Sequence, residues 1–180
     1  MTDLFLGLGD FTINLILSFL ILIFTLRILL ALCSANAYNP ITQSIIKISR
    51  PIRYLFFFLP NFGKFEISSF MIIFICHFLS NFLGSDIVME RLIILSFKGS
   101  IFSILNALTI IFIILAISSW FVQLSASNRS PVLDIIYQIS NPILFLIKRL
   151  VPTSVGIIDF SVIIALVLIH FLQQFIDIIL

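Results

Sequence analysis

The stretch NPITQSIIKISRP, residues 39–51, places two prolines eleven residues apart in an otherwise strongly apolar chain. Asn39 followed by Pro40 is a helix-start signal, because the asparagine oxygen can cap the first turn and proline needs no N–H donor there. Over the next ten positions Ile41, Ile45 and Ile48 fall on one helical face, and the glutamine, lysine and arginine fall largely on the other. A helix this short cannot cross a bilayer, but it can lie in the membrane interface. Pro51 is predicted to end it and to start a second short segment.

The same arrangement returns in SPVLDIIYQISNP, residues 130–142. Matches continue beyond it with small changes in spacing: Pro40, Pro51, Pro60, Glu66, Ser68 and His77 correspond to Pro131, Pro142, Pro152, Asp159, Ser161 and His170. Such a series indicates an internal duplication, with residues 1–98 as repeat 1 and residues 99–180 as repeat 2. Each repeat is predicted to contain two spans, an even number, so both copies insert in the same direction about a pseudo-twofold axis along the membrane normal.

The composition excludes a soluble globular protein. The 180-residue chain is 61% hydrophobic and only 10% charged, whereas soluble domains are about half apolar and about a quarter charged. Four stretches are long and apolar enough to span the hydrocarbon core: 11–33, 66–84, 100–122 and 159–178. The predicted fold is therefore an all-α membrane protein with four transmembrane helices in two parallel repeats. Each repeat adds a platform of short amphipathic interfacial helices on the cytoplasmic side, residues 39–60 and 130–152.

The distribution of basic residues predicts the orientation in the membrane. Connections 34–65 and 123–158 contain seven lysines and arginines, connection 85–99 contains two, and the segment before the first span contains none. Because cytoplasmic loops are rich in basic residues, both proline-rich connections are predicted to be cytoplasmic and both termini external. The N-terminal segment lacks the basic region and cleavage site of a signal peptide, so the first span is predicted to stay in the membrane. The net charge of +2 follows from this topology, and no nucleic-acid partner is predicted.

A distinctive pattern begins at the end of the stretch 130–142. It consists of Pro142, the basic pair Lys148-Arg149, Pro152, Gly156 and then Asp159-Phe160-Ser161. Together with PIRYLFFFLP and FEIS in the first copy, it resembles the YggT (YlmG-like) family of small membrane proteins over nearly the whole chain. The chain departs from that pattern where Val162 replaces a proline, a lysine replaces one arginine, and Glu66 replaces an aspartate. The resemblance implies a bacterial inner-membrane protein connected with osmotic stress tolerance, cell division and envelope organisation, and in plastids with cytochrome maturation. It implies no known catalytic activity.

Glu66 and Asp159 are predicted at the cytoplasmic starts of the second and fourth spans. There a carboxylate complements the helix dipole and can cap free N–H groups, which is the favoured interpretation. The alternative is a functional site in which Asp159 pairs with the basic pair and Glu66 pairs with Arg53 or Lys64, so that the ion pairs pin the platform or bind an anionic lipid headgroup. The candidate members of this site are Lys148, Arg149, Asp159, Ser161, Arg53 and Glu66. The basic residues by themselves would set topology or attract anionic lipid.

Three ionisable residues are candidates inside the membrane. Arg27 is expected about 9 Å deep in the first span, from about six residues of helical rise; snorkelling to the interface is favoured over an internal ion pair. His77 and His170 are expected near the middle of the second and fourth spans. A proton path through them is one interpretation, and a neutral imidazole bonded to a neighbouring helix is the favoured one.

No sequence pattern predicts a catalytic, cofactor-binding or metal-binding site, since nucleophile, base and metal-ligand spacings are all missing from the sequence. The predicted function is a non-enzymatic scaffold or assembly factor that supports envelope integrity. The alternative is a small channel or transporter for an ion or solute. The partners expected are the lipid bilayer including anionic lipids, an unidentified membrane protein, and further copies of the chain.

Overall fold

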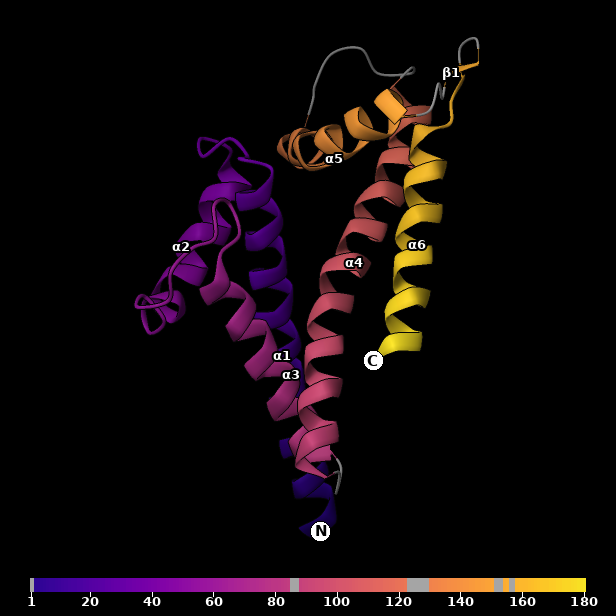
Figure 1. Ribbon diagram of the computed structural model, residues 1–180. Helices are drawn as coiled ribbons and strands as arrows, with labels where there is room; N and C mark the ends of the chain where they lie inside the picture. The colour runs from indigo at the N-terminus through magenta and orange to yellow at the C-terminus, as the bar shows by residue number, and fades with distance from the viewer. Residues whose placement is uncertain (1, 85–87, 123–129, 151–153, 156–157) are drawn as a thin grey trace.

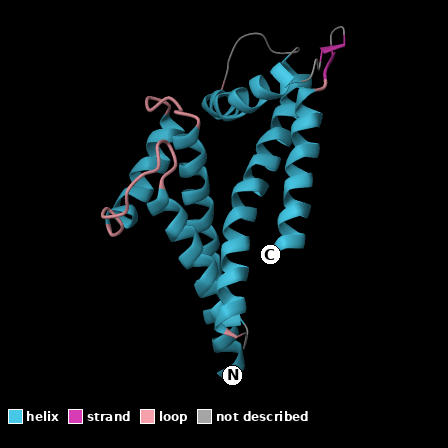
Figure 2. Ribbon diagram, viewed as in Figure 1, coloured by secondary structure: helices cyan, strands magenta, loops and turns pink. Residues whose placement is uncertain are grey.

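The computed structural model of this protein describes residues 2–84, 88–122, 130–150, 154–155 and 158–180 (Figure 1). Helices account for most of this described chain (Figure 2). The elements follow in the order α1 (Thr2–Leu32), α2 (Pro40–Tyr54), α3 (Ile67–Gly84), α4 (Met89–Val122), α5 (Pro131–Leu150), β1 (Ser154–Val155), β2 (Ile158–Asp159) and α6 (Ser161–Ile179). The all-helical prediction is therefore confirmed, apart from one very short hairpin.

Within the described residues, three helices are long and apolar enough to cross a membrane: Leu8–Leu32 in α1, Met89–Ser118 in α4 and Ser161–Ile179 in α6. A further apolar segment, Ile67–Leu83 in α3, is shorter. Runs of this length and composition are typical of transmembrane helices, because helical hydrogen bonding satisfies every backbone group in the absence of water. The chain is thus a helical membrane protein, and its fourth span stays a prediction.

α4 begins earlier than the sequence predicted. The connection 85–99 was expected from its charged residues, but Met89 already starts the helix. Glu90 lies in the first turn, where an acidic side chain complements the helix dipole, and Lys98 Nζ lies 2.7 Å from Asp177 Oδ1 of α6. The helix therefore accommodates the charges that suggested a loop. The predicted boundary between the repeats, residue 98, lies inside this continuous helix.

The prediction that the second proline ends each interfacial helix is wrong. α2 continues through Pro51, and α5 continues through Pro142. Proline in a helix interior removes one hydrogen bond and costs about 3 kcal/mol. In α5 the buried face extends across the proline, with Ile139 on one side and Leu144 on the other. Burial of apolar side chains on both sides offsets the local penalty, so packing overrides the helix-breaking signal.

α1, α3, α4 and α6 form the bundle, in which α3 packs against α1 and α4, and α6 packs against α4. α2 and α5 both lie at the same end of it, and α5 runs across that end (Figure 1). One apolar cluster joins α1 to α3 through side chains such as Phe24, Ile28 and Ile73. The second joins α1, α2, α4, α5 and α6, with the fully buried Phe112 among its members.

A tight turn precedes α3. Phe62 and Phe65 exchange backbone hydrogen bonds at 3.0 and 2.9 Å, and Gly63 between them has a φ of +58°, a conformation that glycine adopts without steric cost. Before α6, Val155 pairs with Ile158 in the β1–β2 hairpin. These two pairs lie 93 residues apart in the chain, so α3 and α6 each follow a short antiparallel pairing of the backbone.

Candidate functional site

A buried ion pair joins the last turns of α1 to the residue that precedes α3. Arg27 Nε donates to Glu66 Oε2 at 2.7 Å, and Nη2 donates to Glu66 Oε1 at 3.3 Å. The guanidinium thus grips both carboxylate oxygens, the bidentate geometry that makes arginine–carboxylate pairs strong. Arg27 is only 9% exposed. The expectation that Arg27 snorkels to the interface is wrong, because a carboxylate 39 residues later in the chain lies within its reach.

Two serines complete the cluster. Ser49 of α2 accepts a hydrogen bond from Arg27 Nη1 at 2.5 Å and donates its own hydroxyl to the carbonyl of Ile45 at 2.6 Å. Ser69 of α3 donates to Glu66 Oε2 at 2.7 Å. Ser49 is fully buried because α2 lies directly on α1 at this position. The arginine therefore binds three elements together: its own helix α1, the helix α2 and the start of α3.

Arg53 of α2 supplies a second positive charge. Its Nε lies 3.5 Å from Glu66 Oε2, and its side chain is about one third exposed. Burial raises the pKa of Glu66, but hydrogen bonds from Arg27 and Ser69 and the charges of Arg27 and Arg53 outweigh burial and lower the pKa below its usual value. Glu66 is therefore ionised at neutral pH. Two arginines and one carboxylate leave the cluster with one net positive charge.

A cleft of about 200 Å³ opens beside the ion pair. Its lining is mainly small and apolar, from Leu30, Ala31, Ser34, Ala35, Ala37, Thr42 and Ile46, with Arg27 and Glu66 as the charged members. α1 ends here in a Schellman motif, since Ala35 N–H bonds to Leu30 O at 2.9 Å and Ser34 N–H bonds to Ala31 O at 3.1 Å. Ser34 has a φ of +50° at the position where glycine is usual. The small residues let the chain reverse closely and bring α2 back onto α1.

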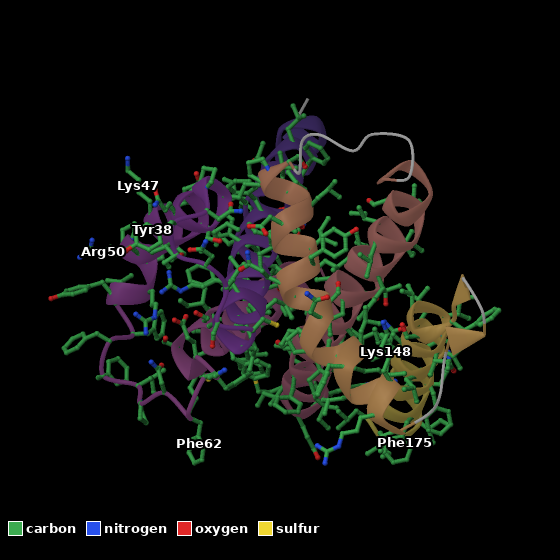
Figure 3. All side chains as sticks on the ribbon, turned by 90° about the horizontal axis from the view of Figure 1, so that it is seen from above. Tyr38, Lys47, Arg50, Phe62, Lys148 and Phe175 are labelled. Atoms are coloured by element: carbon green, nitrogen blue, oxygen red, sulfur yellow. The ribbon has the colours of Figure 1, made fainter. Side chains whose placement is uncertain are left out.

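The second copy of the predicted site is only partly visible. Ser161 is fully buried at the start of α6, and Lys148 and Arg149 are exposed in the last turn of α5. Asp159 pairs with Ser154 in the short hairpin, but its side chain lies outside the described residues. The unit of Lys148, Arg149 and Asp159 therefore stays a prediction. On α2, Lys47 and Arg50 project away from the bundle (Figure 3).

The two histidines differ in their surroundings. His77 Nε2 lies 2.8 Å from Ser103 Oγ of α4, which is the bond to a neighbouring helix that the sequence favoured. His170 is exposed on α6. The structure gives no continuous polar connection between them within the described chain. Among the described residues no cluster of His, Cys, Asp and Glu could hold a metal ion.

A polar junction that the sequence did not reveal joins α2 to α5, the two α-helices that begin at a proline. Asn39 caps α2 by accepting the N–H of Ile41 at 2.9 Å, and its amide donates to Pro131 O at 2.9 Å and to Asp134 Oδ2 at 3.3 Å. Gln138 of α5 donates to the same Asp134 oxygen at 2.8 Å. The capping role of Asn39 was readable from the Asn-Pro pair. Its second role depends on a contact across 92 residues, for which the local sequence gives no signal.

The fold and the site define a class: a helical membrane protein whose helices α2 and α5 are joined to the bundle and to each other by buried charged and polar side chains. The chain belongs to the CCB3/YggT family, whose sequence profile matches residues 94–180. It is 30% identical over 155 residues to an uncharacterised protein of Haemophilus influenzae, covering 86% of this chain and 83% of that one.

Two further relatives carry equally little functional information. The uncharacterised protein YggT of Escherichia coli K12 is 27% identical over 168 residues, with 91% of this chain and 86% of that one covered. An uncharacterised protein of Vibrio alginolyticus, named for its place in the proC 3′ region, is 27% identical over 178 residues, with 90% and 89% covered. No solved structure matches the chain significantly.

Proposed function

We propose that the protein is a non-enzymatic scaffold or assembly factor of the bacterial inner membrane, with four spans in two repeats. α3 supports the fourth span: its 18 residues extend about 27 Å at ~1.5 Å per residue, close to the ~30 Å of the hydrocarbon core. With four spans α2 and α5 fall on one side of the membrane, in agreement with their common end of the bundle (Figure 1). The excess of basic residues favours the cytoplasm for that side.

The observation that carries the scaffold role is the anchoring of α2 by the Arg27–Glu66 pair. Arg27 donates three hydrogen bonds, to Glu66 and Ser49. The cluster therefore has a structural role, which is to hold α1, α2 and the start of α3 together. The anchoring leaves Lys47 and Arg50 exposed on the outer side of α2 (Figure 3). A rigid basic surface at the membrane interface suits contact with anionic headgroups, at about 1 kcal/mol per basic residue, and with other membrane proteins.

The test uses growth under osmotic stress in a strain that lacks its own relative of this protein. Lys47→Glu combined with Arg50→Glu should leave the protein folded, because both side chains are exposed, and should abolish the restored growth. Gln43→Glu is the control, because it also adds a negative charge at an exposed position of α2 but keeps both basic residues. It should restore growth. Full restoration by the double variant would contradict a role for this surface.

The rival function, a channel or transporter, is tested on the purified protein. In liposomes loaded with an ion-sensitive or volume-sensitive dye, the protein should give no flux above that of empty liposomes under an osmotic or ionic gradient. The polar side chains of the spans support this expectation, because several of them bond one helix to another: Ser80 to Asn14, His77 to Ser103 and Gln173 to Asn106. A protein-dependent flux that saturates with solute concentration would contradict the scaffold proposal and identify the protein as a transporter.

A further inference from the structure

The two repeats reproduce the same polar bond between their first and last helices. Ser80 of α3 donates to Asn14 Oδ1 of α1 at 2.7 Å, and Gln173 of α6 donates to Asn106 Oδ1 of α4 at 2.9 Å. Asn14 and Asn106 are 92 residues apart, and Ser80 and Gln173 are 93 apart. α6 therefore sits on α4 in the way that α3 sits on α1, with the same side of the helix facing its partner.

α3 uses a second face to bind α4. His77 lies 2.8 Å from Ser103 Oγ, and Asn81 Nδ2 donates to Ser96 Oγ at 3.4 Å. Gly99 of α4 permits this approach, because a Cβ added there would lie 2.9 Å from His77 Nδ1. A glycine and two serines on α4 thus form the surface that receives a histidine and an asparagine from α3. Small residues at such positions are typical of helix contacts in membranes.

The corresponding face of α6 is uncovered. His170 and Gln174 stand 93 residues after His77 and Asn81; both are exposed, and neither has a hydrogen-bond partner among the described residues. Only 11% of the α6 span is buried, compared with 44% of the α1 span. Polar side chains inside a membrane almost always face another helix or a water-filled cavity, since exposure to lipid is costly. α6 therefore presents the binding face of α3 without the helix that binds it.

The helix equivalent to α4 in the first repeat is α1, and α1 carries a matching position. Gly7 lies 92 residues before Gly99, the same spacing that relates Asn14 to Asn106. Within one chain α1 cannot fill the vacant face, because α6 packs mainly against α4 and α5 and lies on the other side of α4 from α1 (Figure 1). α1 also runs antiparallel to α6, as α4 does to α3 (Figure 1). A neighbouring copy with the same membrane orientation can therefore supply α1 in the required direction.

We propose that the protein is a homo-oligomer in which α1 of one copy packs on the His170–Gln174 face of α6 in the next. A dimer closes when a two-fold axis along the membrane normal brings α1 of each copy onto α6 of the other, and a ring closes when the contact repeats head to tail through more copies. The contact covers His170 and Gln174 by close packing around Gly7. It supplies no serine to them, because Leu4 and Phe11 stand 92 residues before Ser96 and Ser103. The contact goes beyond the proposed scaffold role, and its test measures association without reference to growth.

The test is disulfide crosslinking between two differently tagged chains in native membranes. Both chains carry Cys33→Ala and Cys76→Ala; one adds His170→Cys and the other adds Phe11→Cys, the position 92 residues before Ser103. Oxidation should give a dimer that carries both tags. The matched control is Phe171→Cys with Phe11→Cys, because Phe171 is 65% exposed and its side chain is rotated by about 100° from that of His170. It should give at most a tenth of that dimer.

A second measurement keeps the native cysteines. Gly7→Leu should lower the oligomer fraction in mild detergent several-fold, as measured by light scattering after gel filtration. Gly9→Leu should leave it unchanged, because a Cβ at Gly9 meets no atom within 4 Å. Equal crosslinking through Phe171, or the absence of a dimer that carries both tags, would overturn the proposal. A monomer in membranes and in detergent, with both chains inserted at the wild-type level, would overturn it as well.

Discussion

At the scale of single residues, Arg27 and Glu66 are the most consequential pair. Removing one partner of a buried ion pair costs about 3–5 kcal/mol, because the other charge is left uncompensated. Arg27→Ala or Glu66→Gln should therefore lower the stability of the protein in detergent by about that amount, while the double variant loses clearly less than the sum of the two. Thermal unfolding of the four proteins measures this. Lys47→Ala, at an exposed position, is the control and should shift stability by less than about 0.5 kcal/mol. Additive losses would mean that the two side chains act independently.

Glu66 also makes stability depend on pH in a defined direction. Its pKa in the folded protein is lowered from the ordinary value of 4.5 by its hydrogen bonds and by the two arginines, despite burial. A lowered pKa contributes stability that is present above the unfolded-state pKa and is lost as the pH falls through the folded-state pKa. The wild-type unfolding temperature should thus decline on acidification below 4.5, and Glu66→Gln should flatten this decline. Parallel pH profiles for the two proteins would assign the acid sensitivity to other groups.

Ser34 carries backbone strain at the end of α1. With a φ of +50°, a non-glycine residue in the left-handed region costs roughly 1 kcal/mol. Ser34→Gly should therefore raise stability by up to about 1 kcal/mol, and Ser34→Val should lower it, because a β-branched side chain tolerates this conformation least. Unfolding temperatures in one detergent would measure both. A loss on changing Ser34 to glycine would show that the hydroxyl contributes more than the strain costs.

At the scale of elements, the close contact of α3 with α4 depends on Gly99. A methyl group there would approach the His77 ring to 2.9 Å, so the ring must move and its bond to Ser103 is disturbed. Gly99→Ala should destabilise the protein by about 1–3 kcal/mol, the usual cost of overpacking. Gly9→Ala in α1, where no atom lies within 4 Å, should be neutral or gain up to about 1 kcal/mol from helix propensity. If His77→Ala fails to relieve the effect of Gly99→Ala, the clash lies elsewhere.

The elements also show where sequence reasoning succeeds and where it stops. Pro40 and Pro131 mark the first residues of α2 and α5, because capping and proline at the first turn are local effects. Pro51 and Pro142 do not end those helices, because their fate is decided by burial against distant helices. Arg27 was assigned by its depth alone, and its partner Glu66 lies 39 residues away. The composition of a helix predicts whether it lies in the membrane. Its side-chain partners depend on distances that only the folded chain defines.

At the scale of the whole molecule, topology is the property that sequence charge predicts and that remains open to direct measurement. The predicted topology has both termini external and α2 and α5 cytoplasmic, so a cysteine at position 2 should react with an impermeant thiol reagent in intact cells. A cysteine at position 44, on the exposed side of α2, should react only after permeabilisation. Thr2→Cys and Ser44→Cys in chains that lack the two native cysteines give the comparison. Labelling in intact cells at position 44 but not at position 2 would show that the orientation in the membrane is the reverse of the predicted one.

The Asn39 junction can form only after the second half of the chain has been synthesised. The helix cap of α2 is available as soon as its first turn leaves the ribosome, but the carbonyl and carboxylate that receive its amide, on Pro131 and Asp134, are still to be translated. At about 5–20 residues per second, the missing partners arrive on the order of 5–20 s later. For that interval the first half must persist in the membrane with its amide bound to water or lipid. The junction then forms as a late step that records the arrival of the second half.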